Sequence, residues 1–233
     1  SARKNFRNEI YSDYKANRSD APDDLIPQFE FIRKSVKAFN LPSIELINYE
    51  ADDLIATYVE QILKEGAKAT IVSSDKDLMQ LYKKNIRIYD PMKNKFISNE
   101  DVNNKFGVNP DKVIDVQALA GDSSDNVPGV PGIGIKTAAE LINQYGNLEN
   151  LLKNADKIKQ NKRRETLIQN KDKAIVSKKL VTLKKDVPVK NKISEFQLKE
   201  IDKNKLYSFL REMEFNRLLS SAISTYGEIE FSN

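Results

Sequence analysis

The amino-acid sequence predicts an α/β fold with a mostly parallel sheet flanked by helices, followed by a helical subdomain. Up to about residue 107, strand-like and helical segments alternate, which favours a parallel sheet. Beyond Asn109-Pro110 helical patterns dominate, so we expect two domains, 1–108 and 109–233. A chain of 233 residues, 39% of them hydrophobic, suits one large domain or two small ones.

The elements expected in the first domain follow from apolar spacing and turn signals. Residues 1–20 are polar and lack a sustained apolar stripe, so they predict a segment that is mobile or ordered by a partner. Apolar residues at helical spacing predict one helix over 22–39 and another that opens at Asp52 and ends at Gly66. A short helix is expected at 78–82. Short apolar runs predict strands at 44–48, 69–74, 86–90 and 95–98, of which the last two form a hairpin.

The second domain is expected to be almost entirely helical. Its apolar residues recur at helical spacing in four segments, 111–120, 136–146, 149–154 and 206–215. No apolar run in the chain approaches the roughly 20 residues of a membrane span.

The chain contains neither cysteine nor histidine. Disulfides are therefore impossible, and a reducing, cytoplasmic setting is favoured. Catalysis of the Ser-His-Asp or Cys-His type is excluded, as are zinc sites built from His and Cys. Any bound metal must be held by oxygen ligands, which favours Mg²⁺, Mn²⁺ or Ca²⁺.

Positive charge is concentrated in one part of the chain. The formal net charge is only +4. Between Lys153 and Lys192, however, fourteen Lys and Arg face four Asp and Glu, an excess of ten positive charges. A polyanionic partner would explain this segment, and a solvated surface would explain it equally well.

Three short acidic clusters stand at predicted turns. They are Glu50-Ala-Asp52-Asp53, Asp75-Lys-Asp77 and Asp122-Ser-Ser-Asp125. The first two directly follow predicted strands, and functional side chains converge at the carboxyl ends of parallel strands. Residues two apart on an extended chain, or three apart on a helix, share a face, so each cluster could present paired carboxylates. Taken singly, each cluster could instead cap a helix or shape a turn, although Glu50 caps nothing obvious.

Seven carboxylates gathered in one place predict bound cations. Without cations between them, their repulsion would cost several kcal/mol. A pair of divalent ions about 4 Å apart could also activate water and stabilise the leaving oxygen of a phosphodiester. With no histidine to act as base, water activated by metal is the expected nucleophile.

The stretch GDSSDNVPGVPGIGIKT at 121–137 resembles a nucleotide-binding loop only superficially. A Rossmann fingerprint would need a third glycine after Gly132 and Gly134, and a P-loop would not have Ile135 before Lys136-Thr137. The stretch fits a different motif, which consists of a helix, a short glycine hairpin and a second helix. In that motif, backbone N–H groups and a helix N-terminus approach a phosphate of a nucleic-acid backbone. A tight connection between two helices remains the structural alternative.

The motifs together resemble one family, the 5′-nuclease superfamily, and specifically the 5′-3′ exonuclease domain of bacterial DNA polymerase I. The matching stretches run through essentially the whole chain. They are YEADD (49–53), SSDKDLMQL (73–81), GDSSDNVPGVPGIGIKTA (121–138) and FLREMEFNRLL (209–219). The segment FRNEIYSDYKANR (6–18) resembles the helical arch of this family, which engages the threaded 5′ strand.

The resemblance implies a site and its cofactors. It implies two Mg²⁺ or Mn²⁺ ions, with metal ligands Glu50, Asp52, Asp53, Asp75, Asp77, Asp122 and Asp125. It assigns catalytic roles to Lys15, Arg18, Asp53 and Asp75, since a cation aimed at the transferring phosphate meets growing charge there. It implies DNA contacts by Arg7, Tyr14, Lys15, Arg18, Gly132, Gly134, Lys136 and Thr137. A K⁺ ion is implied at the helix-hairpin-helix.

The implied function is a nuclease for 5′ flaps and RNA primers in DNA replication and repair. Implied partners are flapped, nicked or branched duplex DNA and the remaining polymerase I segments, and the implied location is the bacterial nucleoid. Members of this family begin with a strand and two metal-binding aspartates that would precede Ser1, so we expect an N-terminally truncated nuclease fold. The alternative function is a catalytically impaired module that grips duplex DNA through the helix-hairpin-helix.

Overall fold

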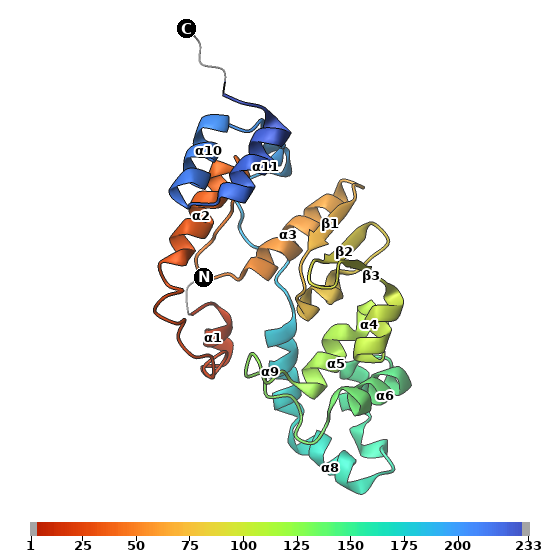
Figure 1. Ribbon diagram of the computed structural model, residues 1–233. Helices are drawn as coiled ribbons and strands as arrows, with labels where there is room; N and C mark the ends of the chain where they lie inside the picture. Colours follow the sequence, from red (N-terminus) through yellow and green to blue (C-terminus); the bar gives the residue numbers. More distant parts are fainter. Residues whose placement is uncertain (1–3, 230–233) are drawn as a thin grey trace. The chain divides into compact units, whose positions relative to one another are not determined.

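The structure, a computed structural model, describes residues 4–229 and divides into two compact units (Figure 1). The larger unit comprises residues 4–18 and 46–189, and the smaller unit comprises residues 19–45 and 190–229. The domain boundary expected near residue 108 falls within the larger unit and stays a prediction. Among the described residues, no helix is both long enough and apolar enough to cross a membrane.

The larger unit contains a three-stranded sheet. Its strands are β1 (Ala69–Val72), β2 (Ile86–Asp90) and β3 (Lys95–Ile97), in the order β1-β2-β3. β1 and β2 are parallel, with Ile71 opposite Ile88, and β2 and β3 form the expected antiparallel hairpin. The α/β class and these three strands are confirmed.

The strand expected at 44–48 is wrong. This segment has no regular structure, and it connects the smaller unit to the larger one. Asn48 has a φ of 74°, which breaks an extended chain, and Ile47 is 86% exposed. The short apolar run therefore finds no strand to pair with among the described residues.

The remaining elements of the larger unit are helical. They are α1 (Arg7–Ile10), α3 (Ala51–Lys64), η1 (Lys76–Leu81), α4 (Asn99–Phe106), η2 (Pro110–Lys112), α5 (Val113–Ala120), α6 (Ile135–Tyr145), α7 (Leu148–Lys153), η3 (Ala155–Lys157), α8 (Asn161–Gln169) and α9 (Lys171–Val181). Local chemistry sets several of their ends. Ser98 and Asp101 form a capping box at the start of α4, and Gly107, in the left-handed conformation, ends that helix.

Helix α5 lies at the centre of the larger unit. It packs against both α6 and α9 and also contacts η1. Val116 and Leu119 on α5 are completely buried, together with Ile142 on α6. Because α5 ends at Gly121, immediately before the third acidic cluster, this core fixes where that cluster begins (Figure 1).

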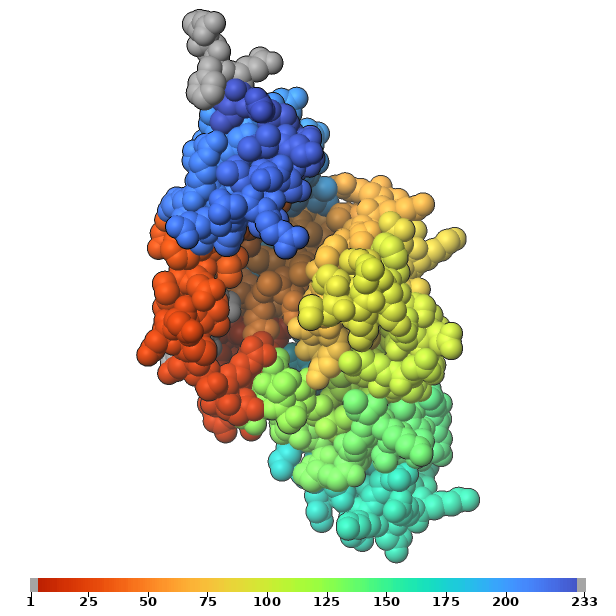
Figure 2. Space-filling model, viewed as in Figure 1, coloured from red at the N-terminus to blue at the C-terminus, as the bar shows by residue number. Residues whose placement is uncertain are grey.

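The N-terminal segment was expected to be mobile or ordered by a partner, and this is wrong for residues 4–18. The N–H of Lys15 donates to the carbonyl of Asp125 at 2.9 Å, and the amide of Asn17 donates to the carbonyl of Ser123 at 2.6 Å. Tyr14 is 5% exposed and belongs to the main core. In Figure 2 the red N-terminal segment abuts the green loop that carries Ser123. Residues 1–3 lie outside the described part of the chain.

The smaller unit contains α2 (Gln28–Ala38), η4 (Ile193–Phe196), α10 (Lys203–Glu212) and α11 (Asn216–Tyr226). The helix expected over 22–39 is shorter, because residues 23–27 form turns and Pro27 occupies its N-cap. α10 packs on α2 and α11 through the buried Leu206 and Leu210.

The loop between α5 and α6 depends on glycine, and this predicts an unequal response to alanine. Gly129 has a φ of 58°, and a Cβ there would lie 2.5 Å from the backbone nitrogen of Gly121. We expect Gly129→Ala to lower the free energy of unfolding by about 1–3 kcal/mol, measured by denaturant titration. The control is Gly134→Ala, because Gly134 has a φ of −88° and no atom near its would-be Cβ. Equal losses in the two variants would contradict this account of the loop.

Candidate metal centre

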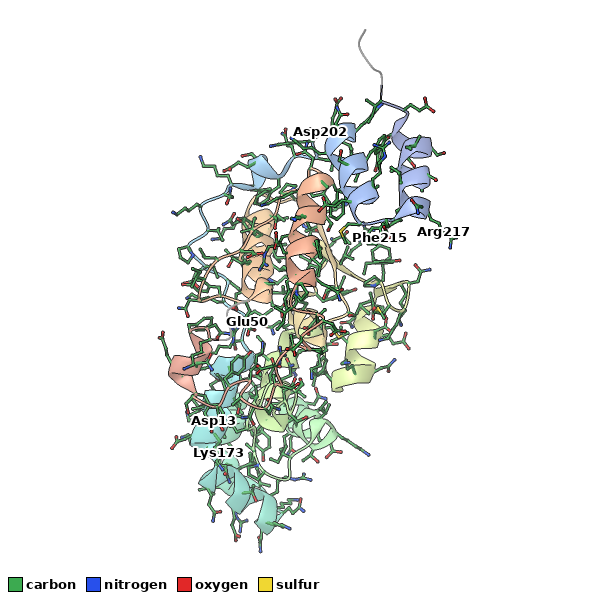
Figure 3. The ribbon with its side chains drawn as sticks, turned by 60° about the vertical axis from the view of Figure 1, so that its left-hand side comes forward. Asp13, Glu50, Lys173, Asp202, Phe215 and Arg217 are labelled. Carbon is green, nitrogen blue, oxygen red and sulfur yellow. The ribbon has the colours of Figure 1, made fainter. Side chains whose placement is uncertain are left out.

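The three acidic clusters lie at the starts of α3 and η1 and in the turn after α5. Glu50 is the N-cap residue of α3 and forms a capping box with Asp53, so the expectation that Glu50 caps nothing is wrong. Asp75, the third residue after β1, is the N-cap residue of η1 and accepts a hydrogen bond from the N–H of Asp77 at 2.9 Å. Figure 3 labels Glu50 at the start of α3.

The third cluster is held by a tight turn. Backbone hydrogen bonds join Asp122 and Val127 in both directions, at 3.0 and 2.8 Å. The N–H and hydroxyl of Ser124 both donate to Oδ1 of Asp122, at 2.9 and 2.6 Å. Asp122 and Asp125 are each 8% exposed. The turn therefore buries both carboxylates against the rest of the unit.

The structure brings the clusters together. One pocket is lined by carboxylates of all three, namely Glu50, Asp52, Asp77, Asp122 and Asp125. Burial, followed by the charges of Asp75 and Glu50, raises the pKa of Asp52 to about 7. Burial also raises the pKa of Asp77 to about 6, against a hydrogen bond from Gln117 that lowers it. Both pKa values are raised first by burial and then by the neighbouring carboxylates.

Positive side chains from two segments stand among these carboxylates. Lys15 Nζ lies 2.5 Å from Oε1 of Glu50 and 3.4 Å from Oδ2 of Asp125. Arg18 contacts the other oxygen of Asp125 at 2.5 Å. On η1, Lys76 Nζ lies 2.5 Å from Oδ2 of Asp122. Each of these cations offsets a carboxylate that would otherwise repel its neighbours.

Lys15 is held in a conformation that is unusual for a lysine. Its φ is 57°, in the left-handed region that non-glycine residues seldom adopt. The bond from its N–H to Asp125 and the contact of Nζ with the Tyr14 ring, 5.0 Å from the ring centroid, keep it there. Such strain persists only where the surroundings impose it, and it clusters at functional sites.

Tyr14 joins two of the clusters. Its hydroxyl lies 3.3 Å from both Oε2 of Glu50 and Oδ2 of Asp125. Burial and the charge of Glu50 raise the pKa of Tyr14 far above its usual value, so the phenol stays protonated and donates.

Asp53 is the carboxylate of the YEADD motif that the structure turns away from the others. Arg7 binds both of its oxygens, each at 2.7 Å, and the N–H groups of Glu50 and Lys184 donate to it as well, at 3.1 and 2.9 Å. Burial opposes ionisation of Asp53, but the Arg7 bonds outweigh it and hold the pKa of the carboxyl below its usual range. Arg7 is itself only 1% exposed. These two residues therefore bind each other, inside the protein.

The carboxylates fit a divalent cation by their chemistry. All candidate ligands are oxygens, and their mutual repulsion is what a cation would relieve. Between residues 4 and 229, no three carboxylates are gathered closely enough to coordinate one ion. Lys15, Arg18 and Lys76 occupy carboxylate oxygens instead, and these contacts would have to open when an ion binds.

The hairpin residues lie apart from this pocket on the α5–α6 connection. Gly132 and Gly134 have no atoms near their would-be Cβ positions, so their backbone is open to solvent. Ile133 between them is buried and anchors the turn. Gly134 is the N-cap residue of α6 and supplies no side chain, Lys136 is exposed, and Thr137 is half-buried. The first turn of α6 therefore presents its backbone N–H groups outward.

Sequence reasoning missed three residues that touch the site. The amide of Asn5 donates to Oε1 of Glu50 at 2.7 Å, and that of Gln117 donates to Oδ1 of Asp77 at 2.6 Å. Lys76 had a sequence signal, because it stands between Asp75 and Asp77. Asn5 and Gln117 are far from their partners in the chain, so only the fold reveals them.

The chain is similar to known proteins over most of its length. Two family models match it, the 5′-3′ exonuclease N-terminal resolvase-like domain at residues 1–107 and the 5′-3′ exonuclease C-terminal SAM fold at residues 108–204. A 5′-3′ exonuclease of Aquifex aeolicus is 41% identical over 93% of this chain and 73% of its own length. DNA polymerase I of Rhizobium leguminosarum is 54% identical over 92% of this chain, which spans only 21% of that protein.

Solved structures share the fold at low sequence identity. The T5 5′-exonuclease with bound zinc ions has a TM-score of 0.65 at 21% identity, covering 97% of this chain and 81% of its own. The catalytic core of Rad2 in complex with DNA substrate has a TM-score of 0.60 at 18% identity, covering 97% of this chain and 76% of its own.

The buried pair of Arg7 and Asp53 predicts a large loss of stability when one partner is removed. Arg7→Met would leave Asp53 charged, buried and unpaired, which costs about 3–5 kcal/mol in the free energy of unfolding. Adding Asp53→Asn to that variant is expected to recover part of the loss, since no buried charge then remains. Denaturant titration measures both changes.

The control for this prediction is an exposed ion pair. Arg33 and Glu45 lie 2.8 Å apart on the surface of the smaller unit, so Arg33→Met should change stability little. A loss for Arg7→Met as small as that for Arg33→Met would contradict the anchoring role of Arg7.

Proposed function

This chain belongs to the 5′-3′ exonuclease family, and we propose that it is a structure-specific nuclease that hydrolyses phosphodiester bonds of 5′ flaps and RNA primers on DNA. The observation that carries this proposal is the pocket lined by carboxylates of three clusters, two of which, Glu50 and Asp125, are bound by Lys15 and Arg18. Negative oxygens for cations and positive side chains for a phosphate stand side by side there, as phosphodiester cleavage requires.

Six carboxylates are proposed to hold two divalent ions, Mg²⁺ or Mn²⁺. They are Glu50, Asp52, Asp75, Asp77, Asp122 and Asp125. When bound, such ions activate water and stabilise the leaving oxygen. We propose that Asp53 acts indirectly, because hydrogen bonds from Arg7 and two backbone N–H groups engage both of its oxygens. It orders the start of α3, which carries Glu50 and Asp52.

Lys15 and Arg18 are proposed to bind the scissile phosphate. In the structure they pair with Glu50 and Asp125, which are proposed ligands. When cations take over those carboxylates, both side chains become free to meet the charge that grows on the phosphate oxygens. Tyr14 keeps its proton and fixes Glu50 and Asp125 with respect to each other.

Duplex DNA is proposed to bind through the hairpin and the basic segment 153–192. The open backbone at Gly132 and Gly134 and the outward N–H groups of α6 suit a phosphate, bound directly or through a bridging K⁺ ion, and Lys136 and Thr137 follow on the same turn. In the basic segment, Lys178, Lys184 and Lys185 pair with carboxylates, whereas Lys162 and Lys173 are exposed (Lys173 is labelled in Figure 3). The exposed members are the ones proposed to contact DNA.

The proposal predicts metal-dependent cleavage that fails without the η1 carboxylates. We expect Asp75→Asn/Asp77→Asn to reduce cleavage of a labelled 5′-flap substrate in Mg²⁺ or Mn²⁺ by at least about 100-fold, because the cations lose two ligands. Binding of the same DNA should persist.

The matched control for cleavage is Asp111→Asn, an exposed aspartate on η2 that should keep full activity. Metal-dependent cleavage by the native chain is the result the proposal requires. Duplex binding without any cleavage by the native chain would instead favour a DNA-binding module.

The hairpin predicts a change in the salt dependence of DNA binding. Removing one cation that neutralises a phosphate reduces the slope of log K against log salt by about 0.9, so Lys136→Ala should flatten the slope by about one unit. Fluorescence anisotropy at a series of salt concentrations measures it. The control, Lys68→Ala, removes an exposed lysine ahead of β1 and should leave the slope unchanged. Equal slopes for native protein and Lys136→Ala would show that Lys136 does not bind a phosphate.

A further inference from the structure

A buried glutamine on α5 touches the candidate metal centre. Gln117 is 3% exposed in the helix VIDVQALA, whose other buried positions are mostly apolar. Its Nε2 donates to Oδ1 of Asp77 at 2.6 Å. Its Oε1 is also buried and makes no hydrogen bond to any described residue.

Packing alone does not explain this glutamine. Burying an amide with an unsatisfied oxygen costs about 1–3 kcal/mol, and an apolar side chain of similar size would avoid that cost. Gln80 shows what a structural glutamine looks like in the same unit. Its Nε2 donates to the carbonyl of Val181 and its Oε1 accepts from the N–H of Leu183, at 3.0 and 3.1 Å. In Gln117, by contrast, only the Nε2 group, which faces Asp77, makes a hydrogen bond to a described residue.

The position of Gln117 connects two of the acidic clusters. Asp77 lies in the first turn of η1, and α5 leads through Gly121 directly into Asp122. A hydrogen bond from α5 to Asp77 therefore fixes the η1 carboxylate relative to the helix that places Asp122. The α5 end of this link is well packed, because α5 is the central helix of the core.

The chemistry of the contact also matters. Lys15 and Lys76 bind carboxylates of the site as cations, so they neutralise them and compete with an incoming ion. An amide N–H orients a carboxylate without contributing a net charge. Asp77 is thus oriented while its full negative charge remains for an ion.

We propose that Gln117 is a positioning residue of the ion site, which holds Asp77 in its binding orientation through a neutral hydrogen bond. This inference rests on the proposed function, since it takes Asp77 as a ligand. Side chains that support ligands from behind typically contribute about 10- to 100-fold to metal affinity or activity.

The test measures Mn²⁺ binding directly. Free Mn²⁺ is followed by electron paramagnetic resonance during titration of native protein, Gln117→Met and Gln117→Lys, without DNA. We expect Gln117→Met to raise the Kd for Mn²⁺ about tenfold or more, because Asp77 loses its support. Gln117→Lys keeps a donor but adds a positive charge, and it should also raise the Kd. Flap cleavage by Gln117→Met should shift to higher Mn²⁺ concentrations by a similar factor.

The matched control is Gln80→Met. It removes two hydrogen bonds of a buried glutamine and should lower the melting temperature, but the Kd for Mn²⁺ should stay at the native value. In an Asp77→Asn background, Gln117→Met should cause no further decrease in Mn²⁺ affinity, because it acts through Asp77. Melting curves show that each variant is folded, and Gln117→Lys serves as the second variant if Gln117→Met unfolds.

The outcomes separate this inference from the proposed function. Native Mn²⁺ affinity in both Gln117 variants would overturn the inference and leave the nuclease proposal standing. An equal decrease in affinity in the native and Asp77→Asn backgrounds would overturn it as well, because Gln117 would then act elsewhere. A native chain that binds no Mn²⁺ and cleaves no flap would overturn both.

Discussion

The buried ion pair between Arg7 and Asp53 is the interaction on which the site depends. Arg7 binds both oxygens of Asp53 and also donates to the carbonyls of Leu180 and Thr182, so one guanidinium joins α1, the start of α3 and the end of α9. Asp53 in turn accepts the N–H of Glu50 and completes the capping box of α3. The N-terminal segment is thereby fixed where Tyr14, Lys15 and Arg18 reach the carboxylates. Together with the backbone hydrogen bond from Lys15 to Asp125, this anchor fixes where the three side chains stand at the pocket.

The pocket next to this ion pair is electrostatically unfavourable, because it gathers buried carboxylates. Burial and like charges raise the pKa values of Asp52 and Asp77, and Lys15 holds a backbone conformation that costs energy. A chain selected for stability alone would replace several of these carboxylates by apolar residues. The rest of the larger unit supplies the compensation. Its core between α5, α6 and α9 is largely apolar, and it is connected to the pocket through the turn after α5. A stable core beside an unfavourable cluster of carboxylates is the arrangement that a cation site requires.

Much of this architecture follows from local sequence patterns, and the remainder depends on contacts between distant residues. The short apolar runs at 86–90 and 95–98 predict β2 and β3, and the spacing of the acidic residues reveals the three clusters. Asp52 and Asp53, by contrast, are equivalent in the sequence. Their different roles are set by the rotation of about 100° between successive residues of α3 and by Arg7, 46 positions away. The Asp77–Gln117 contact spans 40 positions and leaves no local signal. The strand predicted at 44–48 was wrong for the same reason, because a strand needs a neighbouring strand to pair with, and local sequence does not show whether one is present.

The loop between α5 and α6 joins the acidic turn after α5 to the glycine hairpin before α6. The N–H of Gly129 donates to the hydroxyl of Ser177 on α9, and the N–H of Val130 donates to the carbonyl of Leu119 on α5, at 2.9 and 2.7 Å. Close backbone approach between Gly121 and Gly129 leaves no room for a side chain at either position. Asp122 and Asp125 lie on one side of this contact and the hairpin on the other. Because the loop is fixed at both ends, the separation between the carboxylates and the first turn of α6 is set by the fold. If duplex DNA binds at the hairpin as proposed above, the separation set by this loop would determine where along the DNA backbone the carboxylates meet it.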